Sequence, residues 1–193
     1  MITMKASYNY MTPQEFDRLL AAIPRLNIRK WTVEQVQFLF KISYWCGLRI
    51  NEAIKLSVED FDLVLKRVEL GKTKTEKQGK ATIPDRFLDE LTLYLQGKSG
   101  PLFEDMNYYI VYNWLSRLGV MLNIKSLTTP QATSGEKTKT HIFRKSVGKD
   151  MVYGTYGKKQ PINIVQKKLR HTTLDMTSNY LKVGDEDVAE AGW

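Results

Sequence analysis

Residues 32–56 read TVEQVQFLFKISYWCGLRINEAIKL. Thr32 and, three residues later, Gln35 have the form of a capping box, in which each side chain bonds the backbone N–H of the other residue. Apolar residues then recur every three or four positions, which predicts a helix with a buried face. Gly47 is expected to end this helix, and Asn51 to cap the short helix that follows. The stretch therefore predicts a buried helix, a sharp turn and a second, short helix.

The rest of the chain predicts a mainly α fold with a small antiparallel β-sheet (α+β). Thr12 and Glu15 form a second capping box. Further helices are expected over about 13–23, 84–95, 108–122, 141–153, 161–170 and 172–182, with a turn at 59–62. Alternating residues predict two strands, Arg67–Leu70 and Lys80–Ile83, joined as a hairpin by a basic loop. Residues 126–139 are polar and contain Pro and Gly, which predicts a loop.

Composition limits the class of protein. The chain has 193 residues, of which 42% are hydrophobic and 26% charged, enough for one hydrophobic core and typical of a globular domain. Cys46 is the single cysteine and there are two histidines, which excludes an internal disulfide and argues against a Cys- or His-rich metal centre. No apolar run is long enough to span a membrane, and no signal region follows the N-terminus. A cytoplasmic, reducing location is expected.

The net charge of +8 is unevenly distributed. Residues 137–182 contain eleven Lys and Arg against two acidic residues, and residues 66–80 contain six basic against two acidic residues. The last residues of the chain are acidic. Localised positive charge favours an anionic partner, nucleic acid first. Charge alone is equally consistent with solvated faces, and it does not distinguish an enzyme from a passive binder.

Six residues matter through their order along the chain. Taken singly, each has an ordinary structural reading: a surface arginine, a structural His-x-x-Arg pair, a solvated lysine or a packed tyrosine. As a set they resemble the tyrosine recombinase, or phage integrase, family. Its pattern is an arginine in Gly-Leu-Arg-x-x-Glu, a β-hairpin lysine, a His-x-x-Arg motif, a histidine, and a tyrosine nine residues later. The matching residues are Arg49 with Glu52, Lys74, His141, Arg144, His171 and Tyr180.

The sequence departs from the family pattern at two positions. Arg170 stands where a glycine usually precedes the third-motif histidine, and Lys145 stands where a histidine commonly follows the second arginine. Lys72 and Lys74 both lie in the predicted hairpin loop. Lys74 is preferred as the catalytic lysine, because Lys-Thr followed by Lys-x-x-Ile-Pro looks like the integrase hairpin.

The resemblance covers about residues 10–182. It implies a single catalytic domain over 1–193 with a tail over 183–193, without the family's N-terminal core-binding domain. The chain is then either a catalytic-domain fragment or a naturally small recombinase of the fimbrial switch type. The partly apolar, acidic tail is expected to dock on an adjacent subunit or to fold back on its own; a frayed terminus is an equal alternative.

The resemblance implies a site-specific DNA recombinase that works without ATP, cofactor or metal. Tyr180 would attack a DNA phosphodiester and form a covalent 3′-phosphotyrosyl intermediate. Arg49 and Arg144 would clamp the non-bridging oxygens, since guanidinium groups bind phosphate with fork geometry. Lys74 would protonate the 5′-oxygen that leaves.

The remaining motif residues would assist these steps. His141 is expected to act as a base or proton relay for the tyrosine, and His171 to hydrogen-bond a phosphate oxygen. Glu52 is expected to orient an arginine or histidine rather than to bind a metal.

The basic residues outside the catalytic set are expected to bind phosphates of double-stranded DNA. They are Lys72, Lys77, Lys80, Lys137, Lys139, Lys145, Lys149, Lys158, Lys159, Lys167, Lys168 and Arg170. The family resemblance further implies a monomer in isolation, a homotetramer on paired DNA sites, and a nucleoid-associated protein of prokaryotic, viral or mobile-element origin.

Two alternative functions remain open from the sequence. A type IB topoisomerase shares the chemistry, but the small size and the Leu-x-His spacing favour the recombinase. A non-catalytic DNA-binding regulator on a recombinase fold is disfavoured because every catalytic position is retained.

Overall fold

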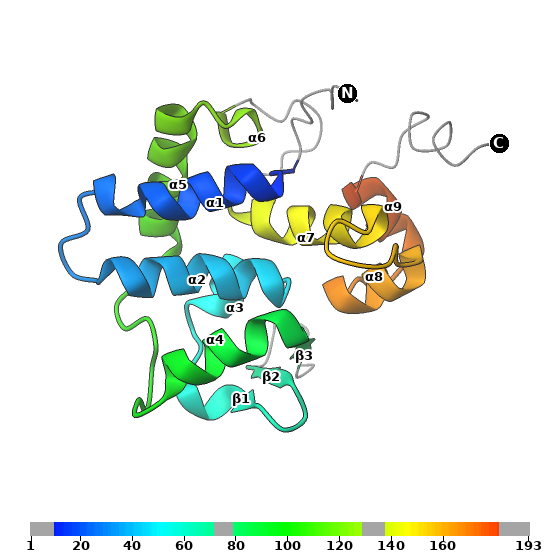
Figure 1. Ribbon diagram of the computed structural model, residues 1–193, viewed down its shortest axis with the longest axis horizontal. Helices are drawn as coiled ribbons and strands as arrows, with labels where there is room; N and C mark the ends of the chain where they lie inside the picture. The colour runs from blue at the N-terminus through cyan, green and yellow to red at the C-terminus, as the bar shows by residue number, and fades with distance from the viewer. Residues whose placement is uncertain (1–9, 72–78, 129–137, 182–193) are drawn as a thin grey trace.

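The computed structural model describes residues 10–71, 79–128 and 138–181, without the side chains of residues 138, 179 and 180. Helix α2 (Val33–Trp45) lies between α1 (Pro13–Ala22) and α4 (Asp85–Leu95) (Figure 1). Aromatic rings join these three helices. Phe16 of α1 stacks on Tyr44 of α2 with ring centroids 4.3 Å apart, and Phe38 of α2 stacks on Tyr94 of α4 at 3.5 Å. The helical core predicted from the apolar spacing of residues 32–56 is confirmed.

Both predicted capping boxes are present. The backbone N–H of Glu15 donates to Thr12 Oγ1 at 3.2 Å, and the N–H of Thr12 donates to a Glu15 carboxylate oxygen at 2.9 Å. Thr32 and Gln35 make the same exchange at 3.1 and 2.9 Å. A short 3₁₀ turn, η1 (Ile23–Arg25), follows α1 and leads toward α2.

The predicted hairpin is part of a three-stranded antiparallel sheet. Strands β2 (Arg67–Leu70) and β3 (Gly79–Thr82) pair as expected, with Val68 opposite Ala81. The turn predicted at 59–62 is wrong. Those residues form the end of the 3₁₀ turn η2 (Val58–Asp60) and strand β1 (Phe61–Asp62), because the backbone continues in extended form and pairs with β2. The mainly α class with a small antiparallel sheet is confirmed.

Helix α5 (Tyr108–Leu122) has the predicted bounds, but the polar segment after it is more regular than expected. Helix α6 (Lys125–Thr128) and the 3₁₀ turn η3 (Thr138–His141) occupy the two ends of the predicted loop; residues 129–137 lie outside the described residues. Leu127 of α6 is buried against α5, which supplies the apolar contact that makes this short helix stable.

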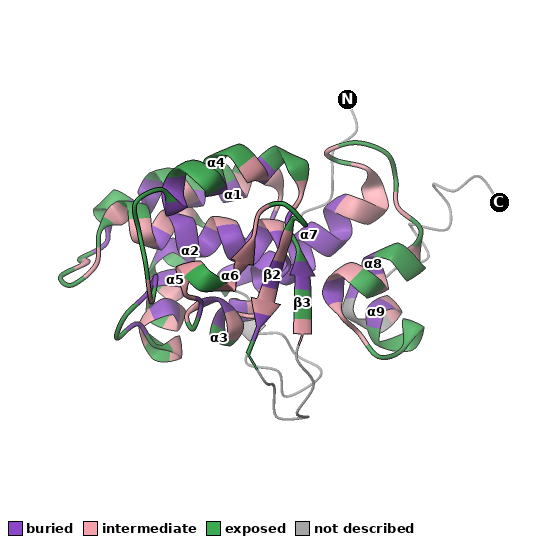
Figure 2. Cartoon of the chain, turned by 90° about the horizontal axis from the view of Figure 1, so that it is seen from below, coloured by how far each residue is buried: buried purple, intermediate pink, exposed green. Residues whose placement is uncertain are grey.

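Helix α7 (Ile142–Tyr153) is buried over residues 142–150 (Figure 2). It packs against α2, η3, α8 (Ile162–Leu169) and α9 (Leu174–Leu181), so its sides are covered by other elements. The two last helices lie within two residues of their predicted bounds. They share with α7 a small separate core whose buried side chains are Val147, Val165, Leu169 and Leu181.

None of the described helices is both long and apolar enough to cross a membrane.

The α5–α6 contact depends on a glycine. A Cβ atom built on Gly119 would lie 2.6 Å from the Cβ of Leu127, a distance that requires the helices to move apart. We expect Gly119→Ala to lower the free energy of unfolding by about 1–3 kcal/mol, as overpacking does. This is the net change, because the clash also outweighs the gain of about 1 kcal/mol from replacing a helical glycine by alanine.

Urea unfolding followed by circular dichroism measures this change. Gly71→Ala is the control, because nothing lies within 4 Å of a Cβ at that position. An undiminished stability of Gly119→Ala would mean that α6 does not pack on α5 in this way.

Candidate active site

Arg49 is placed by the turn that follows α2. Gly47 has φ +63°, in the left-handed region, and lets the chain reverse. Arg49 then begins the short helix α3 (Ile50–Ala53) as its N-cap residue. Its backbone N–H donates to Glu52 Oε2 at 2.8 Å and its Nη1 donates to Glu52 Oε1 at 2.8 Å. The prediction that Asn51 caps this helix is wrong: Asn51 lies inside the first turn, and the Glu52 carboxylate reaches back to Arg49 instead.

Arg144 lies in α7 and is 1% exposed. Its Nη1 donates to the carbonyl oxygen of Gly47 at 2.6 Å, which links α7 to the end of α2. A buried guanidinium needs such partners because leaving water is costly for a charged group. The His-x-x-Arg motif is thereby held next to the Gly-Leu-Arg motif, although Arg144 and Gly47 are 97 residues apart in the chain.

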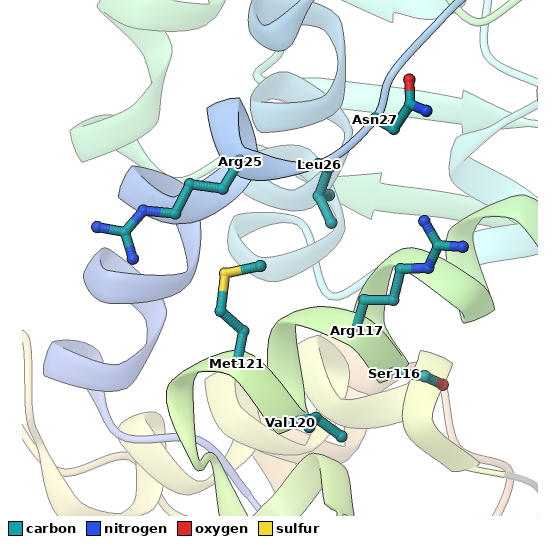
Figure 3. Close-up of a pocket in the computed structure, with 7 residues that line it drawn as sticks. All are labelled: Arg25, Leu26, Asn27, Ser116, Arg117, Val120 and Met121. Atoms are coloured by element: carbon teal, nitrogen blue, oxygen red, sulfur yellow. The ribbon is translucent and has the colours of Figure 1, made fainter.

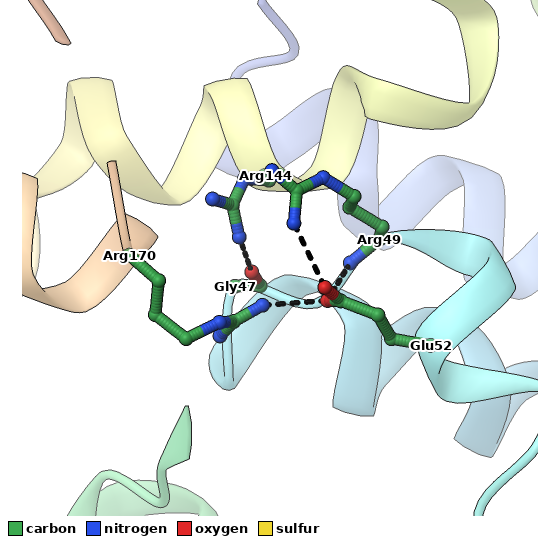
Figure 4. A network of polar contacts seen from close by, with 5 residues as sticks. All are labelled: Gly47, Arg49, Glu52, Arg144 and Arg170. Carbon is green, nitrogen blue, oxygen red and sulfur yellow. Dashed lines mark hydrogen bonds and ion pairs between the residues drawn. The ribbon is translucent and has the colours of Figure 1, made fainter. Parts of the chain in front are cut away.

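Arg170 reaches the same place from the end of α8. It is the C-cap residue of that helix, and its Nη2 donates to Glu52 Oε2 at 2.5 Å (Figure 4). Burial by itself would raise the pKa of Glu52, but the cations of Arg170, Arg49 and Arg144 and the N–H of Arg49 outweigh it and hold the pKa below its usual value. The Glu52 side chain is therefore a carboxylate at neutral pH, and it accepts hydrogen bonds from both Arg49 and Arg170.

His171 directly follows Arg170 and belongs to the same electrostatic cluster. Burial, then the positive charges of Arg144, Arg49 and Arg170 together with His141, lowers the pKa of His171 to about 4. Its Nδ1 lies 3.0 Å from the hydroxyl of Thr177 in α9. The imidazole is neutral at pH 7, and if the Thr177 hydroxyl donates to Nδ1, the ring proton is on Nε2.

The structure thus brings together most of the predicted catalytic residues that it describes. Arg49, Glu52, Arg144 and His171 form one cluster, and His141 in η3 is close enough to contribute to the low pKa of His171. Tyr180 is on helix α9, which packs on α7 and α8, but its side chain lies outside the described residues. The predicted residues Lys72, Lys74, Lys77 and Lys137 also lie outside the described residues.

The predicted DNA-contacting lysines fall into two groups. The exposed ones are Lys80, Lys158, Lys159 and Lys167. Lys139 and Lys168 are half-buried: Lys139 Nζ lies 3.1 Å from Ser116 Oγ, and Lys168 Nζ donates to the carbonyl of Thr82 at 2.7 Å. Lys158, Lys167 and Lys168 line one hollow of about 510 Å³, together with Arg86.

Lys145 and Lys149 were also predicted to bind DNA phosphates. Both are buried, because α7 is covered by the helices around it, and Lys149 Nζ donates to the hydroxyl of Tyr153 at 3.1 Å. Their ammonium groups pack inside the protein in this conformation, and their contact with DNA stays a prediction.

Sequence reasoning missed two polar partners in the site. Thr177, which contacts His171, stands six residues after it and carries no motif of its own. Arg170 was expected to contact DNA, yet it binds Glu52. The one sequence signal for a special role was that it stands where the family usually has glycine.

A second hollow lies apart from this cluster, between η1 and α5, with a volume of about 580 Å³ (Figure 3). Its lining residues are Arg25, Leu26, Asn27, Ser116, Arg117, Val120 and Met121. None of the residues of the arginine cluster lines it. In the part of the chain that the structure describes, no group of three or more His, Cys, Asp or Glu side chains is placed to hold a metal ion.

Known proteins share the sequence pattern and the fold of this chain. The chain belongs to the phage integrase family, whose model matches residues 9–187. It is 27% identical over 192 residues to a tyrosine recombinase of Thermosipho africanus, covering 95% of this chain and 60% of that protein. It is 24% identical over 181 residues to the tyrosine recombinase XerA of Thermococcus kodakarensis, covering 94% and 60%. The chain spans about 60% of the length of these curated relatives.

Solved structures share the fold. The catalytic domain of bacteriophage HP1 integrase is 23% identical, with a TM-score of 0.62, over 95% of this chain and 92% of that one. A crystal structure of XerA recombinase has a TM-score of 0.67 at 17% identity, over 98% of this chain and 65% of that one. The XerH recombinase bound to a palindromic difH substrate has a TM-score of 0.67 at 19% identity, over 98% and 53%.

The low pKa of His171 is directly measurable. We expect its ring signals in an NMR titration to give a pKa of about 4, against 6.5 for an unperturbed histidine. The unfolded chain then binds more protons than the folded one between these two pH values. The free energy of unfolding should therefore fall as the pH is lowered from about 6.5 to about 4.

His171→Gln assigns the signals and should remove its share of this pH dependence. A ring that titrates near 6.5 in the folded protein would contradict the placement of His171 among the three arginines.

Proposed function

We propose that this chain carries out the DNA breaking and joining steps of a site-specific tyrosine recombinase. The observation that carries the proposal is the convergence of Arg49, Arg144 and His171 from three distant segments, next to the helix that bears Tyr180. Family membership over residues 9–187 supports the same conclusion.

The cluster suits a phosphodiester whose charge increases during the reaction. Three guanidinium groups, those of Arg49, Arg144 and Arg170, surround the single carboxylate of Glu52, so positive charge is in excess. Arg49 is 40% exposed and accessible to a substrate. Each of Arg49 and Arg144 would stabilise the negative oxygens of the transition state by about 3–4 kcal/mol, by analogy with an oxyanion-hole donor.

The covalent step needs a nucleophile and an acid. The phenolic oxygen of Tyr180 attacks phosphorus, the bond to the 5′-oxygen breaks, and that oxygen takes a proton from Lys74. The phenol proton passes to His141, because a tyrosine with an ordinary pKa near 10 is a weak nucleophile at neutral pH. The product is a 3′-phosphotyrosyl link, and attack by a second 5′-hydroxyl reverses the step, so that no ATP or metal is needed.

His171 is suited to act as a hydrogen-bond donor rather than as a general base. With its pKa near 4 it is neutral, and a proton on Nε2 would be available to a phosphate oxygen. Glu52 orients Arg49, because it accepts hydrogen bonds from both the backbone N–H and the guanidinium of that residue.

The substrate we propose is double-stranded DNA. The XerH recombinase and the Tn1549 transposon integrase, both similar in fold, have been solved with DNA. The exposed lysines Lys80, Lys158, Lys159 and Lys167 supply positive charge for the phosphates. A tetramer on paired DNA sites, formed from monomers, is part of the proposal, as are association with the nucleoid and a prokaryotic, viral or mobile-element origin.

The nucleophile is tested with a nicked suicide DNA substrate that traps the covalent intermediate. Tyr180→Phe should form no protein–DNA adduct, because the attacking oxygen is gone, while its DNA affinity stays within about threefold of the wild type. The adduct is quantified on a denaturing gel, and the DNA affinity is measured by fluorescence anisotropy. Tyr153→Phe is the matched control and should form the adduct. An undiminished adduct in Tyr180→Phe would rule out this nucleophile, and DNA binding without any adduct in the wild type would favour a non-catalytic regulator.

The general acid is tested with a 5′-bridging phosphorothiolate. Lys74→Ala should slow cleavage of the ordinary ester by about 10²–10⁴-fold, the contribution of a general acid. It should cleave the sulfur ester nearly as fast as the wild type, because a thiolate, with a pKa near 8.5, leaves without a proton. Lys72→Ala is the control. Rescue by sulfur in Lys72→Ala instead would assign the acid to Lys72.

A further inference from the structure

We infer that Arg170 is a positioning residue, which aligns the Arg49 guanidinium through Glu52 and couples it to the lobe formed by α8 and α9. This inference rests on the proposed function. It replaces the phosphate contact that the sequence predicted for Arg170, and it gives a reason why an arginine, rather than a glycine, precedes His171.

The bonds around Glu52 define the coupling. Oε1 accepts from Arg49 Nη1 at 2.8 Å, whereas Oε2 accepts from Arg49 N at 2.8 Å and from Arg170 Nη2 at 2.5 Å (Figure 4). The carboxylate is fixed from the α8 side by Arg170, and it fixes both the backbone and the side chain of Arg49. The side chains of Glu52 and Arg170 are only 12% and 16% exposed, so water competes little for these bonds.

Arg170 carries two costs to stability. Its φ is +52°, in the left-handed region where a glycine is unstrained and an arginine is not. Its Nη1 is buried and has no hydrogen-bond partner among the described residues. A residue with strained backbone and an unsatisfied donor is a poor choice for stability alone, and such sites are typical of function.

The same residue lies at the joint of the lobe that carries the nucleophile. Arg170 ends α8, and α9, with Tyr180, begins at Leu174. The lobe packs on α7, and the bond from Arg170 to Glu52 joins it to α3. Arg170 therefore ties the helix of the nucleophile to the arginine that would bind the phosphate. Loss of the bond between Arg170 and Glu52 should therefore slow the covalent step much more than it weakens DNA binding.

The test compares Arg170→Gly with Lys66→Gly in the full chain. Lys66 is also a cation with a positive φ, +50°, and it has an exposed ion pair with Asp85 at 2.8 Å. Both variants lose one positive charge, one ion pair and one strained backbone. We expect Arg170→Gly to lower the single-turnover rate of adduct formation at saturating DNA at least tenfold. Its DNA affinity should stay within threefold and its thermal midpoint should be equal to or above that of the wild type.

Two further readouts separate positioning from a general structural effect. Methylguanidinium at millimolar concentration should raise the rate of Arg170→Gly and leave Lys66→Gly unchanged, because it can replace the missing group beside Glu52. The NMR order parameter of the Arg49 Nε–H group, measured without DNA, should fall in Arg170→Gly and not in Lys66→Gly.

Each outcome decides the inference. An unchanged rate at saturating DNA, with affinity lost, would make Arg170 a DNA contact. A lower thermal midpoint in Arg170→Gly would make it a stabilising residue. An unchanged Arg49 order parameter would overturn the coupling whether or not the wild type forms an adduct. A wild type that forms no adduct, while the order parameter changes as expected, would overturn the proposed function and leave the coupling in place.

Discussion

The carboxylate of Glu52 joins the start of α3 to the end of α8. It binds the backbone and side chain of Arg49 at the start of α3, and it binds Arg170 at the end of α8. The adjacent Arg144 fixes α7 to the carbonyl of Gly47. A charged group that is largely removed from water requires opposite charge and hydrogen bonds. This requirement is met by contacts between segments that are distant in the sequence.

The cluster carries more positive than negative charge. Glu52 compensates part of the positive charge of Arg49, Arg144 and Arg170. Burial, together with the remaining positive charge, lowers the pKa of His171 and keeps its ring neutral. Like charges held close together repel, so the arrangement is least favourable when no anion is near. A phosphate would relieve this repulsion, and it would do so most strongly when its own negative charge is largest. In the proposed reaction, the same electrostatics that strain the free site would favour the transition state over the substrate.

Local signals were predictable, and contacts between distant segments were not. The capping boxes at Thr12 and Thr32 and the helix over 108–122 depend on residues within a few positions of each other, and they were predicted correctly. The order of motif residues identified Arg49, Arg144 and His171, which the structure brings together. The bond between Glu52 and Arg170 spans 118 residues, and no periodicity encodes it. The burial of Lys145 was missed for the same reason: it depends on the neighbours that cover α7, which local sequence does not specify.

The small core shared by α7, α8 and α9 has a thermodynamic consequence. Its buried side chains, among the described residues, are only Val147, Val165, Leu169 and Leu181, whereas the main core extends over α1 to α7 and the sheet. Few buried apolar contacts mean a low free energy of local opening. We expect α8 and α9 to behave as a separate cooperative unit, with faster amide hydrogen exchange than the main core. The helix that bears Tyr180 would then detach in a partial unfolding event, while the rest of the molecule stays native.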